Sequence, residues 1–173
     1  MINVAVIFAD GMEEIEALTP VDVLRRAGVN VTTYSVSDLV VKGSHGIEIK
    51  ADKLIEEMDA LTCAVVVPGG MPGAKNISEN QKALALIKEV YAGAGLVSAI
   101  CASPAVVLTK AGIVKEKRIT CYPAPDFIQM LKDSDYTGQD VCVDGNLITA
   151  NGPKSAMKFS LEICKALNLN PKF

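Results

Sequence analysis

The chain alternates between two patterns of apolar and polar positions. Short, almost uninterrupted apolar runs, such as "INVAVIF", "CAVVV" and "LVSAI", have the length and character of strands buried on both faces of a parallel sheet. Longer stretches between them repeat their apolar residues every three or four positions, as an amphipathic helix does. The clearest example is "EEIEALTPVDVLRRAG", in which helical spacing is kept by Ile15, Leu18, Val21 and Leu24. The alternation predicts an α/β sandwich around a mostly parallel sheet.

These patterns give approximate bounds for the elements. We expect strands over 2–8, 29–36, 63–67, 96–100 and 118–121, helices over 13–28, 78–94, 103–112, 124–133 and 153–169, and hairpins over 39–52 and 140–150. Gly28 suits the end of the first helix, Ser78 suits the cap of the second, and Pro20 predicts a kink. No repeat or linker interrupts the series, and the length suits one core, so we expect a single domain over 1–173.

Charge and hydropathy narrow the choice of partners. The net charge is -3 and no basic stripe is present, so a nucleic-acid partner is not expected. The longest apolar runs are too short to span a bilayer. No Lys or Arg precedes the first apolar run, which makes it a poor signal peptide. We therefore expect a cytoplasmic protein without a membrane partner.

The cysteines do not form a recognisable framework. Five are present, their spacing is wide and no C-x-x-C occurs, so neither a disulfide network nor a zinc site is expected. Cys63, Cys142 and Cys164 lie within strand or helix patterns and are predicted to be small buried hydrophobes. Cys121, next to Tyr122, is left open. With His45 as the only histidine, a metal centre is not predicted.

Cys101 differs from the other cysteines because it stands between a buried strand and a helix. A tight strand-to-helix turn exposes the side chain at its tip, and the small neighbours Ala99, Ala102 and Ser103 suit such a nucleophile elbow. Unpaired N–H groups at the helix start favour a thiolate. These features predict a reactive, acidic thiol. The alternative is one more small buried hydrophobe, and Cys101 taken alone does not decide between them.

Two further loops fall at the same edge of the predicted sheet. In "VVVPGG", Gly69 and Gly70 let the backbone approach closely and point N–H groups at an oxyanion. In "EEIE", Glu13 and Glu16 open a helix, and two interpretations remain. They are surface acids favoured by the helix dipole, or one of them turns inward and donates a hydrogen bond to the thiol as a neutral acid.

Taken together, "AICASP", "VVVPGG" and "GMEEIEALTPVDVLRRAG" resemble the ThiJ/PfpI superfamily, and most of all the branch of a human protein deglycase linked to familial parkinsonism. The resemblance implies a flavodoxin-like, three-layer α/β fold and a homodimer. It also implies that Cys101 is the nucleophile and that a protonated Glu16 hydrogen-bonds it. The N–H groups of Gly70 and Ala102 would form the oxyanion site, with Gly69, Ser103 and Tyr122 placed in the pocket.

The chain departs from that family pattern at two positions and at its C-terminal end, and it matches the pattern at a further position with a different basic residue. Ala102 stands where the peptidase-like branch has histidine, which counts against peptide hydrolysis. The segment "CYP" places Tyr122 where the human protein has a histidine. In "GSHG", His45 matches a basic residue that approaches the partner subunit's cysteine in that protein, although a solvated turn is the simpler expectation. The chain also lacks the human C-terminal extension.

The function that the resemblance implies is a cysteine-dependent glyoxalase or deglycase. Its substrates would be methylglyoxal-type 2-oxoaldehydes, or their early adducts with thiols and amines, and no cofactor would be needed. A redox-sensing or chaperone protein that uses the same oxidisable Cys101 is the alternative. An intracellular cysteine peptidase is a third and weaker one because of Ala102.

Overall fold

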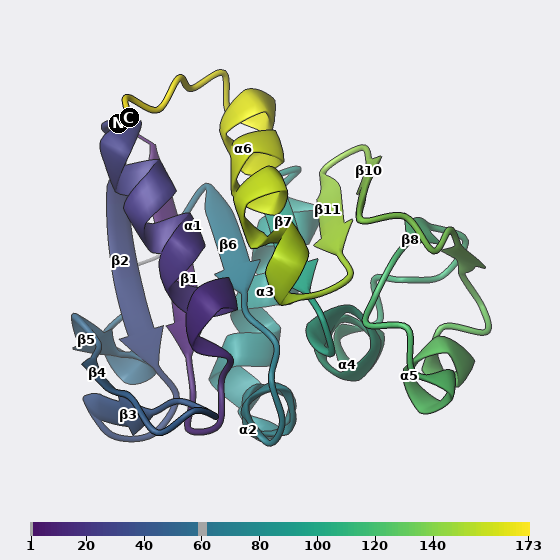
Figure 1. Cartoon of the computed structure of the whole chain (residues 1–173), viewed down its shortest axis with the longest axis horizontal. Helices are drawn as coiled ribbons and strands as arrows, with labels where there is room; N and C mark the ends of the chain where they lie inside the picture. Colours follow the sequence, from purple (N-terminus) through teal and green to yellow (C-terminus); the bar gives the residue numbers. More distant parts are fainter. Residues whose placement is uncertain (1, 59–61) are drawn as a thin grey trace.

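The computed structural model describes residues 2–58 and 62–173. Within these residues the centre is a seven-stranded sheet in the order β10-β11-β7-β6-β1-β2-β5 (Figure 1). Its strands are β1 (Asn3–Phe8), β2 (Asn30–Ser35), β5 (Lys53–Leu54), β6 (Ala64–Val67), β7 (Leu96–Ile100), β10 (Val141–Asp144) and β11 (Leu147–Ala150). Neighbours are parallel except β10 and β11, which form the expected hairpin. The mostly parallel, flavodoxin-like α/β fold is confirmed.

Helices cover both faces of this sheet, which gives three layers. One face carries α1 (Glu14–Arg26) and α6 (Ala156–Ala166), and these two helices pack against each other (Figure 1). The other face carries α2 (Gly73–Glu79), α3 (Gln81–Ala92), a π-helical turn (Pro104–Leu108) and α4 (Thr109–Ala111). Each face buries its own apolar cluster, so both sides of the central strands are shielded from water. This explains why the apolar runs of these strands are continuous in the sequence.

Smaller elements lie at the two edges of the sheet. The hairpin predicted over 39–52 forms as β3 (Val40–Lys42) and β4 (Glu48–Lys50), followed by a 3-10 turn (Ile55–Glu57). Beyond β10, a small lobe holds β8 (Arg118–Ile119), α5 (Pro125–Met130) and β9 (Asp135–Tyr136). A 3-10 turn (Pro153–Ser155) leads into α6. In the described part of the chain, no helix has the length and apolar character required to cross a membrane.

The expected cap of the second long helix was wrong. Asn80, not Ser78, caps α3, and its side-chain oxygen accepts a 2.9 Å hydrogen bond from the N–H of Ala83. Ser78 lies inside α2, a separate short helix that the sequence pattern did not predict. Two buried side chains, Ala74 and Ile77, anchor α2 on the core, so tertiary packing stabilises a segment too short to show a clear period.

The parallel topology brings three loops to one edge of the sheet. β1, β6 and β7 are adjacent and run the same way, so their carboxyl ends meet there. The segment 9–13 follows β1, the loop that contains Gly69 and Gly70 follows β6, and Cys101 follows β7. This is where open α/β sheets place their ligands.

Candidate active site

Cys101 sits at a strained elbow directly after β7. Its φ is 65°, in the left-handed region that residues other than glycine rarely adopt. Two hydrogen bonds hold this backbone: the N–H of Cys101 donates to the carbonyl of Ala150 (2.8 Å), and the N–H of Tyr122 donates to the carbonyl of Cys101 (2.8 Å). The neighbouring strand end and the 122 loop thus fix the conformation that the nucleophile elbow requires.

Three groups converge on the sulfur of Cys101. The backbone N–H groups of Gly70 and Ala102 donate hydrogen bonds to it, and the carboxyl group of Glu16 interacts with it from α1. The thiol is half-buried. The structure therefore brings together the four residues to which the family resemblance gave the nucleophile, the acid and the oxyanion site.

Glu16 is a fully buried carboxyl group at the start of α1. The N–H of Gly69 donates a 2.9 Å hydrogen bond to its Oε2. Its Oε1 meets no conventional hydrogen-bond donor among residues 2–58 and 62–173, although the carboxyl and the Cys101 thiol each contribute to the pKa of the other. Burial is the main cause that raises the pKa of Glu16 to about 7, and the charge of Glu13 adds to it. At neutral pH a large share of Glu16 therefore carries its proton.

The expectation that its position alone makes Cys101 acidic was wrong. Burial raises the pKa of the thiol to about 12, and the charge and hydrogen bond of Glu16 add to this effect. The N–H groups of Gly70 and Ala102 act in the opposite direction. Burial is the largest cause of the raised pKa, and because ionised Glu16 adds to it, protonation of that carboxyl favours the thiolate.

The two glycines of the PGG loop are required by close approach. A Cβ on Gly69 would lie 2.6 Å from both Cβ of Cys101 and Oε2 of Glu16. Gly70 has φ +86°, and a Cβ there would lie 2.5 Å from the backbone nitrogen of Glu13. The loop is thus pressed between the elbow and the start of α1, which aims its N–H groups at the site.

Ser103 and Tyr122 differ in their exposure. Ser103 is fully buried, and its hydroxyl donates to the carbonyl of Pro68, which ties the elbow to the loop after β6. Tyr122 is 45% exposed and its ring lies over Gly152, where an added Cβ would be 3.5 Å from Cδ2. Its backbone bond to Cys101 places this half-open aromatic residue next to the elbow.

His45 lies in the turn between β3 and β4 and contacts the start of α1 in its own chain. Its Nδ1 is 3.1 Å from Oε2 of Glu14 and 3.7 Å from Oε1 of Glu13, while the side chain is 72% exposed. Its backbone N–H donates to Oε1 of Glu14 (2.8 Å). The ligand-type atoms of these three residues lie within 4.8 Å of one another, a spacing that is also common among acidic groups that bind no metal. Contact between His45 and the Cys101 of a partner subunit stays a prediction.

The acids beside Glu16 are buried, which the sequence pattern did not predict. Glu13 is only 8% exposed, so it is not the surface acid of the simpler interpretation, and Glu14 beside it is 6% exposed. Glu13 is the N-cap of α1, and its Oε2 accepts a 2.9 Å hydrogen bond from the N–H of Glu16. Glutamate is not among the preferred N-cap residues, so the sequence carries no clear signal of this cap.

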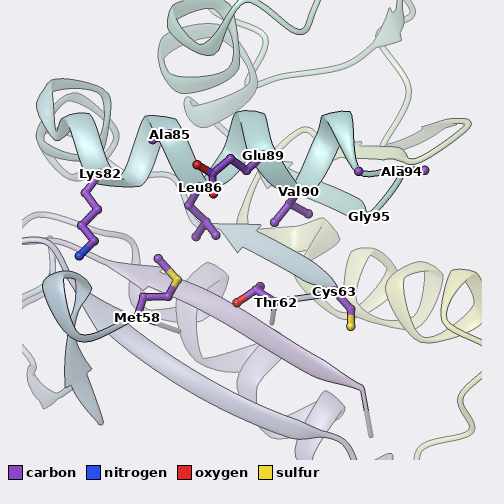
Figure 2. A pocket seen from close by; sticks show the side chains of 11 residues that line it. Met58, Thr62, Cys63, Lys82, Ala85, Leu86, Glu89, Val90, Ala94 and Gly95 are labelled. Atoms are coloured by element: carbon purple, nitrogen blue, oxygen red, sulfur yellow. The ribbon is translucent and has the colours of Figure 1, made fainter. Parts of the chain in front are cut away.

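Cys63 is a second accessible thiol, contrary to the prediction that it is buried. It precedes β6, so it lies at the opposite edge of the sheet from Cys101. It borders a cavity of about 820 Å³ between α3 and the segment before β6 (Figure 2). Cys142 and Cys164 are buried as expected, and Cys121 is buried with a pKa that burial raises to about 11.

An α/β sandwich with a cysteine elbow, a buried glutamic acid and a PGG loop defines a class of cysteine-centred proteins. The chain belongs to the DJ-1/PfpI family, whose model matches residues 2–166. It is 38% identical to Protein dj-1beta of Drosophila melanogaster, over 94% of this chain and 87% of that protein. It is 36% identical to Protein DJ-1 homolog B of Arabidopsis thaliana over 93% of this chain, but spans only 37% of that longer protein.

Solved structures show the same fold. The chain superposes on the crystal structure of Drosophila melanogaster DJ-1beta with a TM-score of 0.90 and 36% identity, covering 99% of this chain and 91% of that one. Oxidized Toxoplasma gondii DJ-1 gives a TM-score of 0.89 and 37% identity, with 96% and 91% covered. A DJ-1-like function follows in general terms, in a family whose members are often enzymes or stress-response proteins.

Proposed function

We propose that the protein is a cofactor-independent enzyme that converts small 2-oxoaldehydes, such as methylglyoxal, or their early adducts with thiols and amines. The observation that carries the proposal is the convergence of the Glu16 carboxyl and the Gly70 and Ala102 N–H groups on the Cys101 sulfur. A nucleophile, a proton carrier and two oxyanion donors are the groups that this chemistry requires.

The reaction begins with the Cys101 thiolate and a protonated Glu16. The sulfur attacks the aldehyde carbon and forms a C–S bond, while the N–H groups of Gly70 and Ala102 hold the new alkoxide. Glu16 gives its proton to this alkoxide and becomes a carboxylate, which takes the proton from the former aldehyde carbon to form an enediolate. Glu16 then returns that proton to the neighbouring carbonyl carbon, and the hydroxyl proton on the first carbon passes to the oxygen of the second, which leaves a thioester with a 2-hydroxyl group. Water cleaves the thioester, releasing 2-hydroxy acid and the thiol. The overall change adds one water to the 2-oxoaldehyde, so no oxidant or reductant is consumed.

The pKa directions support this division of roles. Glu16 titrates near neutral pH, so it can hold and release a proton under working conditions. When it is protonated, the charge that opposes ionisation of Cys101 is removed, and the two N–H groups favour the thiolate. Tyr122, half-exposed beside the elbow, would border the substrate, while Gly69 leaves the space in which sulfur and carboxyl meet.

The homodimer belongs to the same proposal. Exposed apolar side chains stand at the start of α1 and on the β3–β4 hairpin, with Ile15 53%, Ile47 54% and Val40 50% exposed. The N–H of Ile47 lies 3.4 Å from Oε1 of Glu14, so the two segments adjoin. DJ-1 relatives are commonly homodimers. A two-fold interface across this surface would bring each His45 toward the partner's site.

A redox-sensing role is the second candidate. The same N–H groups and the protonated Glu16 would stabilise an oxidised sulfur by hydrogen bonding. One solved relative, Toxoplasma gondii DJ-1, is described as oxidized. Peptidase activity has less support, because the residue after the nucleophile is the buried Ala102 and supplies no base.

The test is turnover of methylglyoxal and of its cysteine and lysine adducts by purified protein, with lactate followed by NMR. Cys101→Ser is compared with Cys63→Ser, a matched control that removes the accessible thiol at the opposite edge. We expect Cys63→Ser to retain the wild-type rate and Cys101→Ser to fall to background. Wild-type turnover no faster than that of Cys101→Ser would exclude the enzyme and leave the redox role.

A further inference from the structure

Glu13 stands beside the proposed catalytic pair, at the start of α1. It is 8% exposed, which is unusual for an acid at a helix start. Its Oε2 caps α1 by accepting a 2.9 Å hydrogen bond from the N–H of Glu16. The residue that immediately precedes the helix therefore fixes the backbone that carries the catalytic acid.

The backbone of Glu13 also locates the PGG loop. Its N–H donates a 3.0 Å hydrogen bond to the carbonyl of Gly69, and Gly70 packs so tightly on its nitrogen that an added Cβ would lie 2.5 Å away. Gly69 in turn donates to Oε2 of Glu16. Glu13 therefore connects the two segments that meet at Cys101, and its side-chain charge is held at a fixed place next to Glu16.

The charged groups around this place are few among the described residues. Glu13 from the same helix start and Cys101 from the elbow are the titratable groups that act on Glu16. His45 faces Glu13 at 3.7 Å, but its closer contact is with Glu14 at 3.1 Å and its side chain is 72% exposed. His45 therefore offsets the negative charge of Glu13 only in part, and this charge acts on Glu16.

We propose that Glu13 is a positioning residue whose buried charge favours the protonated form of Glu16 over its carboxylate, and so raises the share of molecules in which the sulfur of Cys101 carries the negative charge. The inference rests on the Cys101–Glu16 pair of the proposed function, but not on its substrate.

The reason is the geometry of a pair that shares one proton. The proton sits either on Glu16, which leaves a thiolate, or on Cys101, which leaves a carboxylate. A negative charge fixed next to Glu16 destabilises its carboxylate, and so favours the form in which the carboxyl group holds the proton. In agreement with this, Glu13 is among the groups that raise the pKa of Glu16 and is not among those that shift Cys101.

The direct test is the rate at which iodoacetamide alkylates Cys101 between pH 5 and 10, resolved by peptide mass spectrometry in a Cys63→Ser parent. Glu13→Gln has the same shape and keeps an oxygen for the N–H of Glu16, but loses the charge. We expect its alkylation rate at pH 7 to fall about five- to tenfold, the effect of roughly one pKa unit, and its profile to move to higher pH.

Two control variants separate charge from structure. Asp22→Asn removes one exposed charge from the same helix and should follow the parent. Glu13→Asp and Glu13→Asn form a second matched pair, because both are favoured caps and differ only in charge. Glu13→Asp should retain the pH profile of alkylation seen in the parent, and Glu13→Asn should show the slower alkylation expected of Glu13→Gln. This pair still tests the role of the charge if Glu13→Gln does not fold.

Superimposable profiles for the parent and a folded, uncharged variant would overturn the inference. A loss of rate in Glu13→Asp equal to that in Glu13→Asn would also overturn it, because the role would then be purely structural. If the parent turns over no 2-oxoaldehyde but the profiles still move as expected, the proposed function fails and this inference stands.

Discussion

The backbone N–H of Gly69 donates a 2.9 Å hydrogen bond to Oε2 of Glu16, which joins segments 53 residues apart in the sequence. The bond uses Oε2 of the carboxyl group, and the buried Oε1 meets no conventional hydrogen-bond donor within the part of the chain that the structure describes. The bond therefore helps to fix the orientation of the carboxyl group that interacts with the Cys101 thiol. The predictions that follow depend on this arrangement.

Glu16→Gln should separate thiol reactivity from turnover. The amide still donates a hydrogen bond to the sulfur but cannot carry a proton between carbon atoms. We expect turnover of methylglyoxal to fall about a hundredfold or more, while Cys101 is still alkylated by iodoacetamide. Glu79→Gln, an exposed acid in α2, is the control. A Glu16→Gln enzyme with full turnover would remove Glu16 from the mechanism.

Stability should fall as pH rises through the neutral range because of Glu16. Its pKa is about 7 in the folded protein and 4.5 in the unfolded reference, so the folded state binds more protons between these values. The favourable contribution is complete below pH 4.5 and is lost as pH rises through about 7. The shift corresponds to about 3 kcal/mol at most.

The measurement is urea unfolding of wild type and Glu16→Gln at pH 5 and pH 8.5. Glutamine does not titrate, so the variant should lack this part of the pH dependence and gain on the wild type at the higher pH. An unchanged difference in the free energy of unfolding between the two pH values would contradict the raised pKa of Glu16.

Gly69→Ala should damage the site more than the fold. The new methyl group would lie 2.6 Å from Cys101 Cβ and from Glu16 Oε2, so the loop after β6 must move away from both. We expect at least a tenfold loss of turnover and a destabilisation of about 1–3 kcal/mol. Gly93→Ala, where the nearest neighbouring atom is 3.3 Å away, is the control. Wild-type activity in Gly69→Ala would show that this spacing is not required.

The proposed dimer should depend on the exposed apolar surface at the start of α1. Ile47→Glu places a charge among exposed apolar residues that adjoin Glu14. We expect analytical ultracentrifugation to show a dimer for the wild type and a monomer for this variant, while Met130→Glu, on α5, remains dimeric. A wild-type monomer at micromolar concentration would exclude the interface.

His45→Ala should lower turnover without unfolding the protein, if the dimer brings His45 to the partner's Cys101. The histidine would then supply a base or a positive charge that Tyr122 cannot supply. The comparison is kcat and the thermal midpoint of His45→Ala against those of wild type. Unchanged kcat in a protein shown to be dimeric would assign His45 only to its own-chain contacts with Glu14 and Glu13.

The amino-acid sequence by itself determined the layered α/β fold and the location of the site. Apolar runs and helical periods are local properties, so the central strands and most helices were predicted close to their observed bounds. Loops at the ends of parallel strands meet at one edge, so the elbow at Cys101 and the PGG loop followed from the same pattern. The identification of Glu16 as the acid came from the family resemblance.

Only the tertiary structure decided the environment of each group, because burial and charge depend on segments distant in the chain. The hairpin that covers α1 buries Glu14, and the contact with the PGG loop accompanies the burial of Glu13. Cys63 is exposed because it precedes its strand rather than lying inside it. Desolvation and the nearby Glu16 raise the pKa of Cys101, where the local signal of a helix start had predicted the opposite.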